Sequence, residues 1–190
     1  MRDEFLVHFG WIADQFQKHP IDDVFSPGSV EHAILTEFRN GWGMEDTEQL
    51  LRSLSASYGE RAGQAVEDYI AACLRENWAL IGKREAGAGT EIEDFIHVLW
   101  EPLREEGFDF TITNKPGTAA LRVTRCPLAD LARRTGLHDW LYHLACATDF
   151  HTAPAFSPRI VFSRTQTLVQ GHDCCNHRYC YKDDQKVAHS

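Results

Sequence analysis

The sequence predicts an α+β protein in which a helical N-terminal lobe, residues 1–106, packs on a β-β-α-β-β unit with an antiparallel sheet, residues 107–182. Apolar residues recur every three or four positions through the first hundred residues, which is typical of amphipathic helices. After Gly107 the period shortens to two, which is typical of strands. We expect the 190 residues to form a single domain, with 183–190 as a polar tail.

Capping residues and apolar spacing predict the helices of the first lobe in order. One helical face is expected over 5–16, followed by a turn-rich connector and a second helix over 30–38. Asp46 or Thr47 can cap a third helix, which ends at Gly59. The longest pattern covers 60–85, and a glycine-rich linker then leads to Thr90 and a helix over 91–103.

The second lobe begins with a hairpin, because alternating residues at 108–112 and 121–125 flank the turn sequence NKPG. A helix is predicted over 127–150, with Pro127 at its start and an interruption at Gly136. The stretch HTAPAFSP that follows is predicted to be irregular. Alternation at 160–164 and 174–181 then predicts two more strands.

The last strand is unusually rich in sulfur and imidazole, in the sequence GHDCCNHRYC. On a strand, Cys175, His177 and Tyr179 point to one face, whereas Cys174 and Asn176 point to the other. The adjacent cysteines therefore do not easily share one small metal ion or one bond. We predict that the face with Cys175 and His177 is the functional one.

Charge and composition exclude several classes of protein. The net charge of −9 and the pI near 5.5 argue against a nucleic-acid partner, which would call for a basic stripe. No run of 18 apolar residues and no signal peptide are found, so we expect no membrane partner and a cytoplasmic protein with reduced thiols. Residues 1–106 have a charge balance of −12 and 107–190 of +3. The second value weakly favours a small anionic substrate.

Reactive residue types recur on three elements that could converge. Cys126 follows a strand, and Cys175 with His172 lies at the last strand. On the helix between them, His143, Cys146 and Asp149 lie at spacings of three and project to one side, and His151 follows that helix. Core filling by cysteine is the most favoured interpretation, and a catalytic thiol and a metal site stay open.

Zinc is the metal that thiolate and imidazole ligands would suit. Its ligands would be Cys126, Cys146, Cys175 and His172. However, the sequence has no CxxC and no HExxH motif, and CxxD matches common zinc sites poorly. The sequence itself requires no cofactor.

Two arginines are predicted on apolar faces of strands, where an unpaired guanidinium would be costly. They are Arg125 and Arg164. Each either pairs with an internal acid such as Asp149 or meets a substrate carboxylate. The internal pairing is the favoured interpretation.

Taken together, the motifs resemble one known family. The segments LRVTRCPLADLARRTGL at 121–137, CATDF at 146–150 and SPRIVFSRTQTLVQGHDCC at 157–175 are similar to the L-2-amino-thiazoline-4-carboxylic acid hydrolase family. Upstream, YGERAGQAV, ENW and DFIHVLWEPL fit its helical half, so that the resemblance covers roughly 55–180. The last strand is also faintly similar to small-molecule-binding domains of the 4-vinyl reductase type.

The resemblance implies a bacterial hydrolase that opens a C–N bond of a small, carboxylated, amidine- or thiazoline-like substrate. The residues on motif positions are Cys126, Cys146, Asp149, Arg164, Gly171, Asp173 and Cys175. The chain departs from the family pattern directly after the last of these. The family usually has an acid and an aromatic residue there, whereas this chain has Asn176 and His177.

Catalytic roles are therefore predicted for Cys175, Cys146, Asp149 and His172, and substrate-binding roles for Arg164, Arg125, His177 and Cys126. A thiolate could attack directly, Asp149 with a histidine could activate water, or a thiolate-bound metal could act. The alternative functions are a metal-dependent lyase or natural-product tailoring enzyme, and a non-catalytic small-molecule-binding domain. The expected partner is a small-molecule substrate, and a homodimer stays open.

Overall fold

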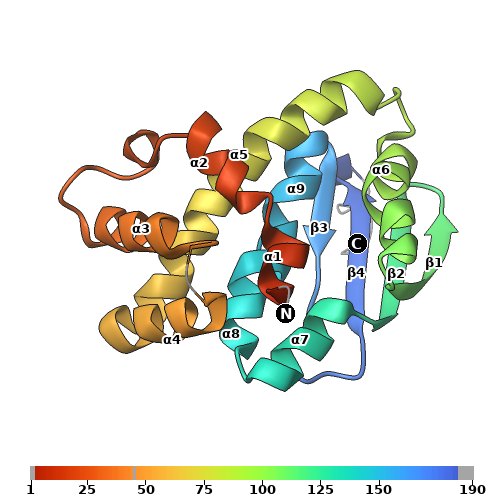
Figure 1. Ribbon diagram of the computed structural model, residues 1–190. Coiled ribbons are helices and arrows are strands. Elements are labelled where there is room, and N and C mark those ends of the chain that lie inside the picture. The colour runs from red at the N-terminus through yellow and green to blue at the C-terminus, as the bar shows by residue number, and fades with distance from the viewer. Residues whose placement is uncertain (1–2, 45, 184–190) are drawn as a thin grey trace. The chain divides into compact units, whose positions relative to one another are not determined.

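The computed structural model describes residues 3–44 and 46–183, so most of the expected polar tail, 184–190, lies outside the described residues (Figure 1). Two compact units form from interleaved segments of the chain. Unit 1 comprises Met1–Cys73 and Leu131–Thr148, and unit 2 comprises Leu74–Asp130 and Asp149–Ser190.

Unit 1 is helical throughout the part that is described. Its elements are α1 (Glu4–Phe9), α2 (Ile12–Lys18), the 3-10 helix η1 (Ile21–Asp23), α3 (Val30–Gly41), α4 (Thr47–Tyr58), the first half of α5 (Glu60–Glu85), the end of α7 (Pro127–Thr135), α8 (His138–Leu141) and the π-helix η2 (Tyr142–Cys146). Stacked rings fill its core, with Phe16 on Tyr69 at 4.8 Å between centroids and Phe38 on Trp42 at 4.7 Å. Such pairs add to the stabilisation that burial alone provides.

The helix boundaries of unit 1 follow the capping residues with one exception. As predicted, Asp46 caps α4 by accepting a 2.9 Å hydrogen bond from the Gln49 N–H, and Gly59 ends it at a φ of 61°. The single helix expected over 5–16 is wrong, because α1 and α2 are separated at Gly10 and Trp11. The bond from the Ala13 N–H to the Gly10 carbonyl spans only three residues, so the backbone tightens there.

Unit 2 contains the sheet. Its elements are the second half of α5, α6 (Glu91–Glu105), β1 (Asp109–Lys115), β2 (Thr118–Arg125), the start of α7, α9 (Asp149–Phe156), β3 (Ile160–Ser163) and β4 (Cys175–Tyr181). The strand order is β1-β2-β4-β3, and every pair is antiparallel. The α+β class and the antiparallel sheet are thus confirmed.

One face of the sheet is buried under helices of the same unit (Figure 1). Phe95 of α6 lies 5.3 Å from Tyr179 of β4 and 5.4 Å from Phe156 of α9, and Trp78 of α5 contacts both phenylalanines. The predicted alternation of β4 is confirmed at its start, because Cys175, His177 and Tyr179 are buried whereas Arg178 is exposed.

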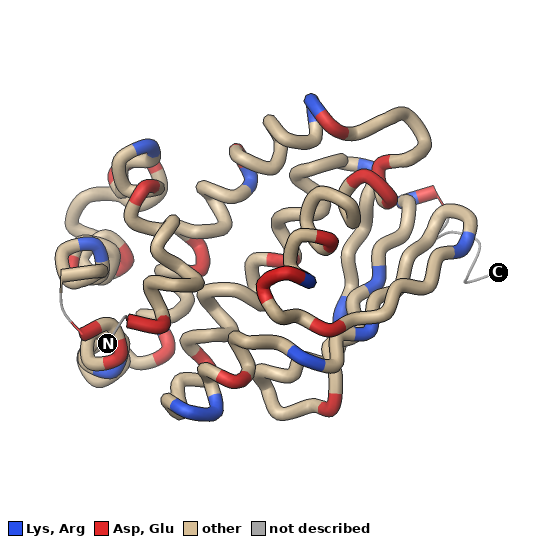
Figure 2. The backbone as a smooth tube through the Cα atoms, turned by 45° about the vertical axis from the view of Figure 1, so that its right-hand side comes forward, with Lys and Arg blue, Asp and Glu red and all other residues tan. Residues whose placement is uncertain are grey.

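Basic residues lie along the strands of the sheet (Figure 2). Arg122 of β2 and Arg178 of β4 are exposed there. The Arg122 guanidinium donates a 3.0 Å hydrogen bond to the Cys174 sulfur. The sheet is therefore apolar on the helix-covered side and polar on the other, as expected for an antiparallel sheet.

Two predictions about unit 2 are wrong. The stretch HTAPAFSP is not irregular, because residues through Phe156 belong to α9. Ala153 and Phe156 are fully or almost fully buried. This packing stabilises the helix more than Pro154 disfavours it. Arg125 does not face the core, because the β1–β2 register shifts between Asp109 and Phe110 and leaves Arg125 exposed. A bulge of this kind reverses the alternation beyond it.

Among the described residues, no helix has both the length and the apolar character that crossing a membrane requires.

Candidate functional site

Four predicted site residues meet on the buried side of the sheet in unit 2. Asp149 begins α9, Arg164 follows β3, and Cys175 and His177 lie on β4. The Arg164 Nη1 atom forms an ion pair with the Asp149 Oδ2 atom. Only 2% of the Arg164 side chain is exposed, compared with 25% for Asp149, so the carboxylate is the more accessible member. The predicted internal pairing of Arg164 with Asp149 is confirmed.

His177 completes this cluster. Its Nε2 atom lies 3.3 Å from the Asp149 Oδ2 atom and 3.4 Å from the Arg164 Nη1 atom. Trp100 packs against the imidazole edge to face at 4.7 Å between centroids, and Phe162 lies on it at 5.6 Å. The indole N–H of Trp100 donates to the Tyr179 hydroxyl at 3.1 Å, which holds the indole in place. The ring of His177 is therefore fixed from several sides.

The partners of His177 determine which of its nitrogens carries a proton. An ionised carboxylate only accepts hydrogen bonds and a guanidinium only donates them. Asp149 is the nearer partner of Nε2, at 3.3 Å compared with 3.4 Å for Arg164, and a proton on Nε2 satisfies this carboxylate and leaves Nδ1 as a bare acceptor. The Nδ1 atom is buried and has no hydrogen-bond partner among the described residues. A buried polar atom without a partner is rare in native proteins, so Nδ1 is the atom of this cluster whose role needs an explanation.

Cys175 of this cluster and Cys126, which follows β2 in the same unit, are both thiols at neutral pH. Burial raises the pKa of Cys126 to about 11, and the negative charges of the neighbouring Cys175 and Asp149 side chains raise this pKa further. Burial also raises the pKa of Cys175, although the Leu168 N–H, 3.2 Å from its sulfur, and the Arg164 charge act in the opposite direction. Neither thiol is activated in the way that a nucleophilic cysteine requires.

Two other predicted residues, His172 and Arg125, are not brought into this cluster. Cys146 belongs to η2 of unit 1, and the helix expected to carry Cys146 and Asp149 on one side is interrupted at 147–148. His172 is exposed, and its backbone N–H binds the Thr167 carbonyl. Arg125 is exposed beyond the bulge. Over the described part of the chain, no three His, Cys, Asp or Glu side chains are placed to hold a metal ion.

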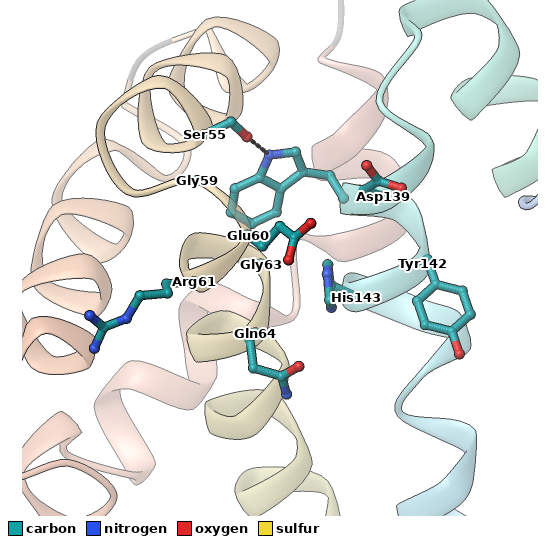
Figure 3. A pocket seen from close by; sticks show the side chains of 10 residues that line it. Ser55, Gly59, Glu60, Arg61, Gly63, Gln64, Asp139, Tyr142 and His143 are labelled. Carbon is teal, nitrogen blue, oxygen red and sulfur yellow. Dashed lines mark hydrogen bonds between the residues drawn. The ribbon is translucent and has the colours of Figure 1, made fainter.

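The sequence did not predict a pocket in unit 1, lined by the start of α5, by α8 and by η2 (Figure 3). His143 of η2 lies in its wall and contacts Glu67 of α5 at 2.6 Å between Nδ1 and Oε2. These two residues are 76 positions apart, and no local pattern in the sequence relates them. The sequence did single out His143, but as a reactive residue on the same helix side as Cys146 and Asp149 and not as part of a pocket with Glu67.

Comparison with known proteins supports the resemblance seen in the sequence. Residues 39–179 match the model of a family described as L-2-amino-thiazoline-4-carboxylic acid hydrolase. No curated protein matches the chain. A similar solved structure is a trafficking protein particle complex subunit 3 from Naegleria fowleri covalently bound to palmitic acid. The two chains are 13% identical, and the TM-score is 0.38. The match covers 80% of this chain and 94% of the other chain. A TM-score this low carries no argument.

Proposed function

Because the chain belongs to the L-2-amino-thiazoline-4-carboxylic acid hydrolase family, we propose that it hydrolyses a small, carboxylated, amidine- or thiazoline-like substrate at a C–N bond. The amidine carbon of such a ring is electrophilic once its nitrogen is protonated. Hydrolysis then needs a nucleophile, a base that removes the proton of the nucleophile, and a proton for the leaving atom.

The observation that carries the proposal is the Asp149–His177 pair with its unpartnered Nδ1 atom. Asp149, which forms an ion pair with Arg164, orients the imidazole through Nε2. The bare Nδ1 then accepts a proton from a water molecule while the water oxygen adds to the amidine carbon. A positioned general base of this kind contributes roughly 10²- to 10⁴-fold to the rate.

The remaining steps use the same groups in reverse. The tetrahedral intermediate collapses when the ring heteroatom leaves, and this atom takes a proton from the imidazolium of His177. One water molecule is consumed and the imidazole returns to its starting state. Asp149 stabilises the imidazolium while it exists, because the two groups have opposite charges.

A water nucleophile is better supported than a covalent thiol. Burial raises the pKa of Cys175, and the nearby Asp149 charge makes its thiolate still less favourable. We therefore assign Cys175 and Cys126 to the wall of the site. Arg164 positions Asp149, since its guanidinium already pairs with that carboxylate.

The substrate itself can differ from the compound that names the family. His177 stands near the end of the matched region, at a position where the family pattern usually has an aromatic residue. A base at a position where the family pattern usually has an aromatic residue would suit a substrate whose nucleophile or leaving atom needs stronger proton transfer. We propose that cyclic amidines without sulfur belong in the substrate screen for this reason.

The test is turnover of L-2-amino-thiazoline-4-carboxylate and of sulfur-free cyclic amidines in water labelled with ¹⁸O, followed by mass spectrometry. We expect one labelled oxygen in a ring-opened product. Opening of the thiazoline at a C–N bond yields no thiol, whereas opening at the C–S bond releases a thiol that a thiol reagent detects. A thiol product would reassign the broken bond, and a folded protein that turns over none of these compounds would contradict the proposal.

A further inference from the structure

Unit 1 contains a cavity of about 660 Å³ that the proposed hydrolysis does not use (Figure 3). Its wall includes Glu60, Gly63 and Gln64 from the start of α5, Asp139 from α8, and Tyr142 and His143 from η2. The volume falls within the range of small-molecule sites, which is roughly 300–1,000 Å³. All of these residues belong to unit 1.

His143 is held in one orientation by Glu67. The distance from Nδ1 to the Glu67 Oε2 atom is 2.6 Å, and the side chains are 22% and 14% exposed. Because a carboxylate oxygen only accepts hydrogen bonds, the single proton of a neutral imidazole lies on Nδ1 here, and Nε2 is then a bare acceptor. The structure gives this Nε2 atom no hydrogen bond to any described residue. It is thus an oriented acceptor in the wall of a cavity.

Gly63 is what allows the imidazole to lie there. A Cβ atom at position 63 would come within 2.3 Å of the His143 Cδ2 atom and 2.8 Å of its Nε2 atom. No larger residue can occupy this helical position without displacing the ring edge that carries Nε2. His143 also lies on a π-helix, a costly and rare local structure that is frequent at functional sites.

The charges around the cavity are unequal. The carboxylates of Glu60 and Asp139 point toward the same space as the imidazole, whereas the guanidinium of Arg61 points away from it (Figure 3). Arg61 forms an ion pair with Glu31 at 2.6 Å, so its charge is already compensated. The cavity therefore presents acceptors and negative charge, which favour a ligand that is a cation and an N–H donor.

A metal ion does not fit this arrangement, since no three ligating side chains in the described residues are placed around one point. Aromatic rings suit a flat organic cation better. The ring of Tyr142 lies 6.0 Å from that of His143, and the indole of Trp140 is fixed by its N–H bond to the Ser55 Oγ atom at 2.7 Å. Cations of this shape are attracted to aromatic faces.

We propose that this pocket is a binding site for a small, planar organic cation with N–H donors, of the amidinium or guanidinium class. One N–H group donates to the Nε2 atom of His143, and the remaining charge lies near Glu60 and Asp139. The site is separate in sequence and in unit from the Asp149–His177 cluster.

The probes are benzamidine, its neutral analogue benzamide and the anion benzoate, titrated into the full-length protein by calorimetry near pH 8. Benzamidine is expected to bind at least tenfold more tightly than benzamide, and benzoate not to bind. Benzamidine that does not bind, or that binds no better than benzoate, overturns the proposal.

Variants locate the binding. Gly63→Ala and Glu67→Gln should each weaken benzamidine binding at least tenfold. Glu48→Gln, at an acid of α4 that is 43% exposed and pairs with Arg52, should leave it unchanged. Asp149→Asn should also leave it unchanged, which separates this site from the proposed catalytic cluster. Binding that persists in both pocket variants, or that is lost in Asp149→Asn, overturns the assignment.

A second measurement does not depend on the folding of these variants. In the wild-type protein, the imidazole carbon signals of His143 in a ¹H–¹³C spectrum should shift and saturate with benzamidine. The signals are assigned by their absence in His143→Gln. No saturable shift at His143 while benzamidine binds elsewhere would overturn the proposal.

Discussion

The burial of Cys126 makes the free energy of unfolding depend on pH in the alkaline range. Burial raises the pKa of this thiol to about 11 from an ordinary value of 9.0, so the folded protein holds its proton more tightly than the unfolded chain does. The stabilisation is complete below about pH 9 and is lost as the pH rises to about 11. Two pKa units correspond to at most about 3 kcal/mol.

We therefore predict that the free energy of unfolding falls between pH 9 and pH 11, and that Cys126→Ala removes up to about 3 kcal/mol of this fall. Urea unfolding of both proteins at pH 8.5 and pH 11 measures the difference. Val123→Ala is the matched control, because it truncates a buried, non-titrating side chain of the same strand region. Should Cys126→Ala keep the wild-type dependence on pH, the assigned shift would be wrong.

The contact between α5 and α9 depends on a single glycine. A Cβ atom at Gly82 would lie 1.8 Å from the backbone carbonyl oxygen of Phe156, which cannot rotate away. The helix α9 therefore approaches α5 more closely than any side chain at position 82 permits. This approach brings the ring of Phe156 within 6.2 Å of Trp78.

We predict that Gly82→Ala destabilises the protein by about 1–3 kcal/mol, although alanine is the better helix former, because overpacking outweighs helix propensity here. The neighbouring exposed substitution Lys83→Ala should change the free energy of unfolding by no more than about 0.5 kcal/mol. Thermal unfolding of the two variants provides the comparison. Equal stabilities would show that α9 can shift away at little cost.

Sequence predicted elements where the local signal was strong. The helix α4 has capping residues, α5 has a long apolar face, and the hairpin of β1 and β2 has its turn sequence, so their positions were predicted closely. The helix α9 was missed because Pro154 suggests a break, whereas buried contacts of Ala153 and Phe156 decide the outcome. The π-helix η2 has no sequence signature of its own, so a continuous α-helix was expected there.

Over the whole molecule, the candidate site was predictable only in part. The pairing of Arg164 with Asp149 follows from a general rule, because a buried guanidinium needs a carboxylate. The alternation of β4 places Cys175 and His177 on the same face. The contact between His143 and Glu67 depends on how helices 76 residues apart pack, and the exposure of Arg125 depends on a bulge. Neither feature can be predicted from the spacing of residues within one segment of the sequence.

The central claim is that His177, oriented by Asp149, is the general base of a hydrolase. The most direct test compares kcat for His177→Gln with that for His97→Gln, an exposed histidine of α6, on the substrate that the screen identifies. We predict that His177→Gln lowers kcat about 100-fold or more at a temperature where circular dichroism shows the variant folded, and that His97→Gln has no effect. A His177→Gln enzyme with wild-type kcat would contradict the account.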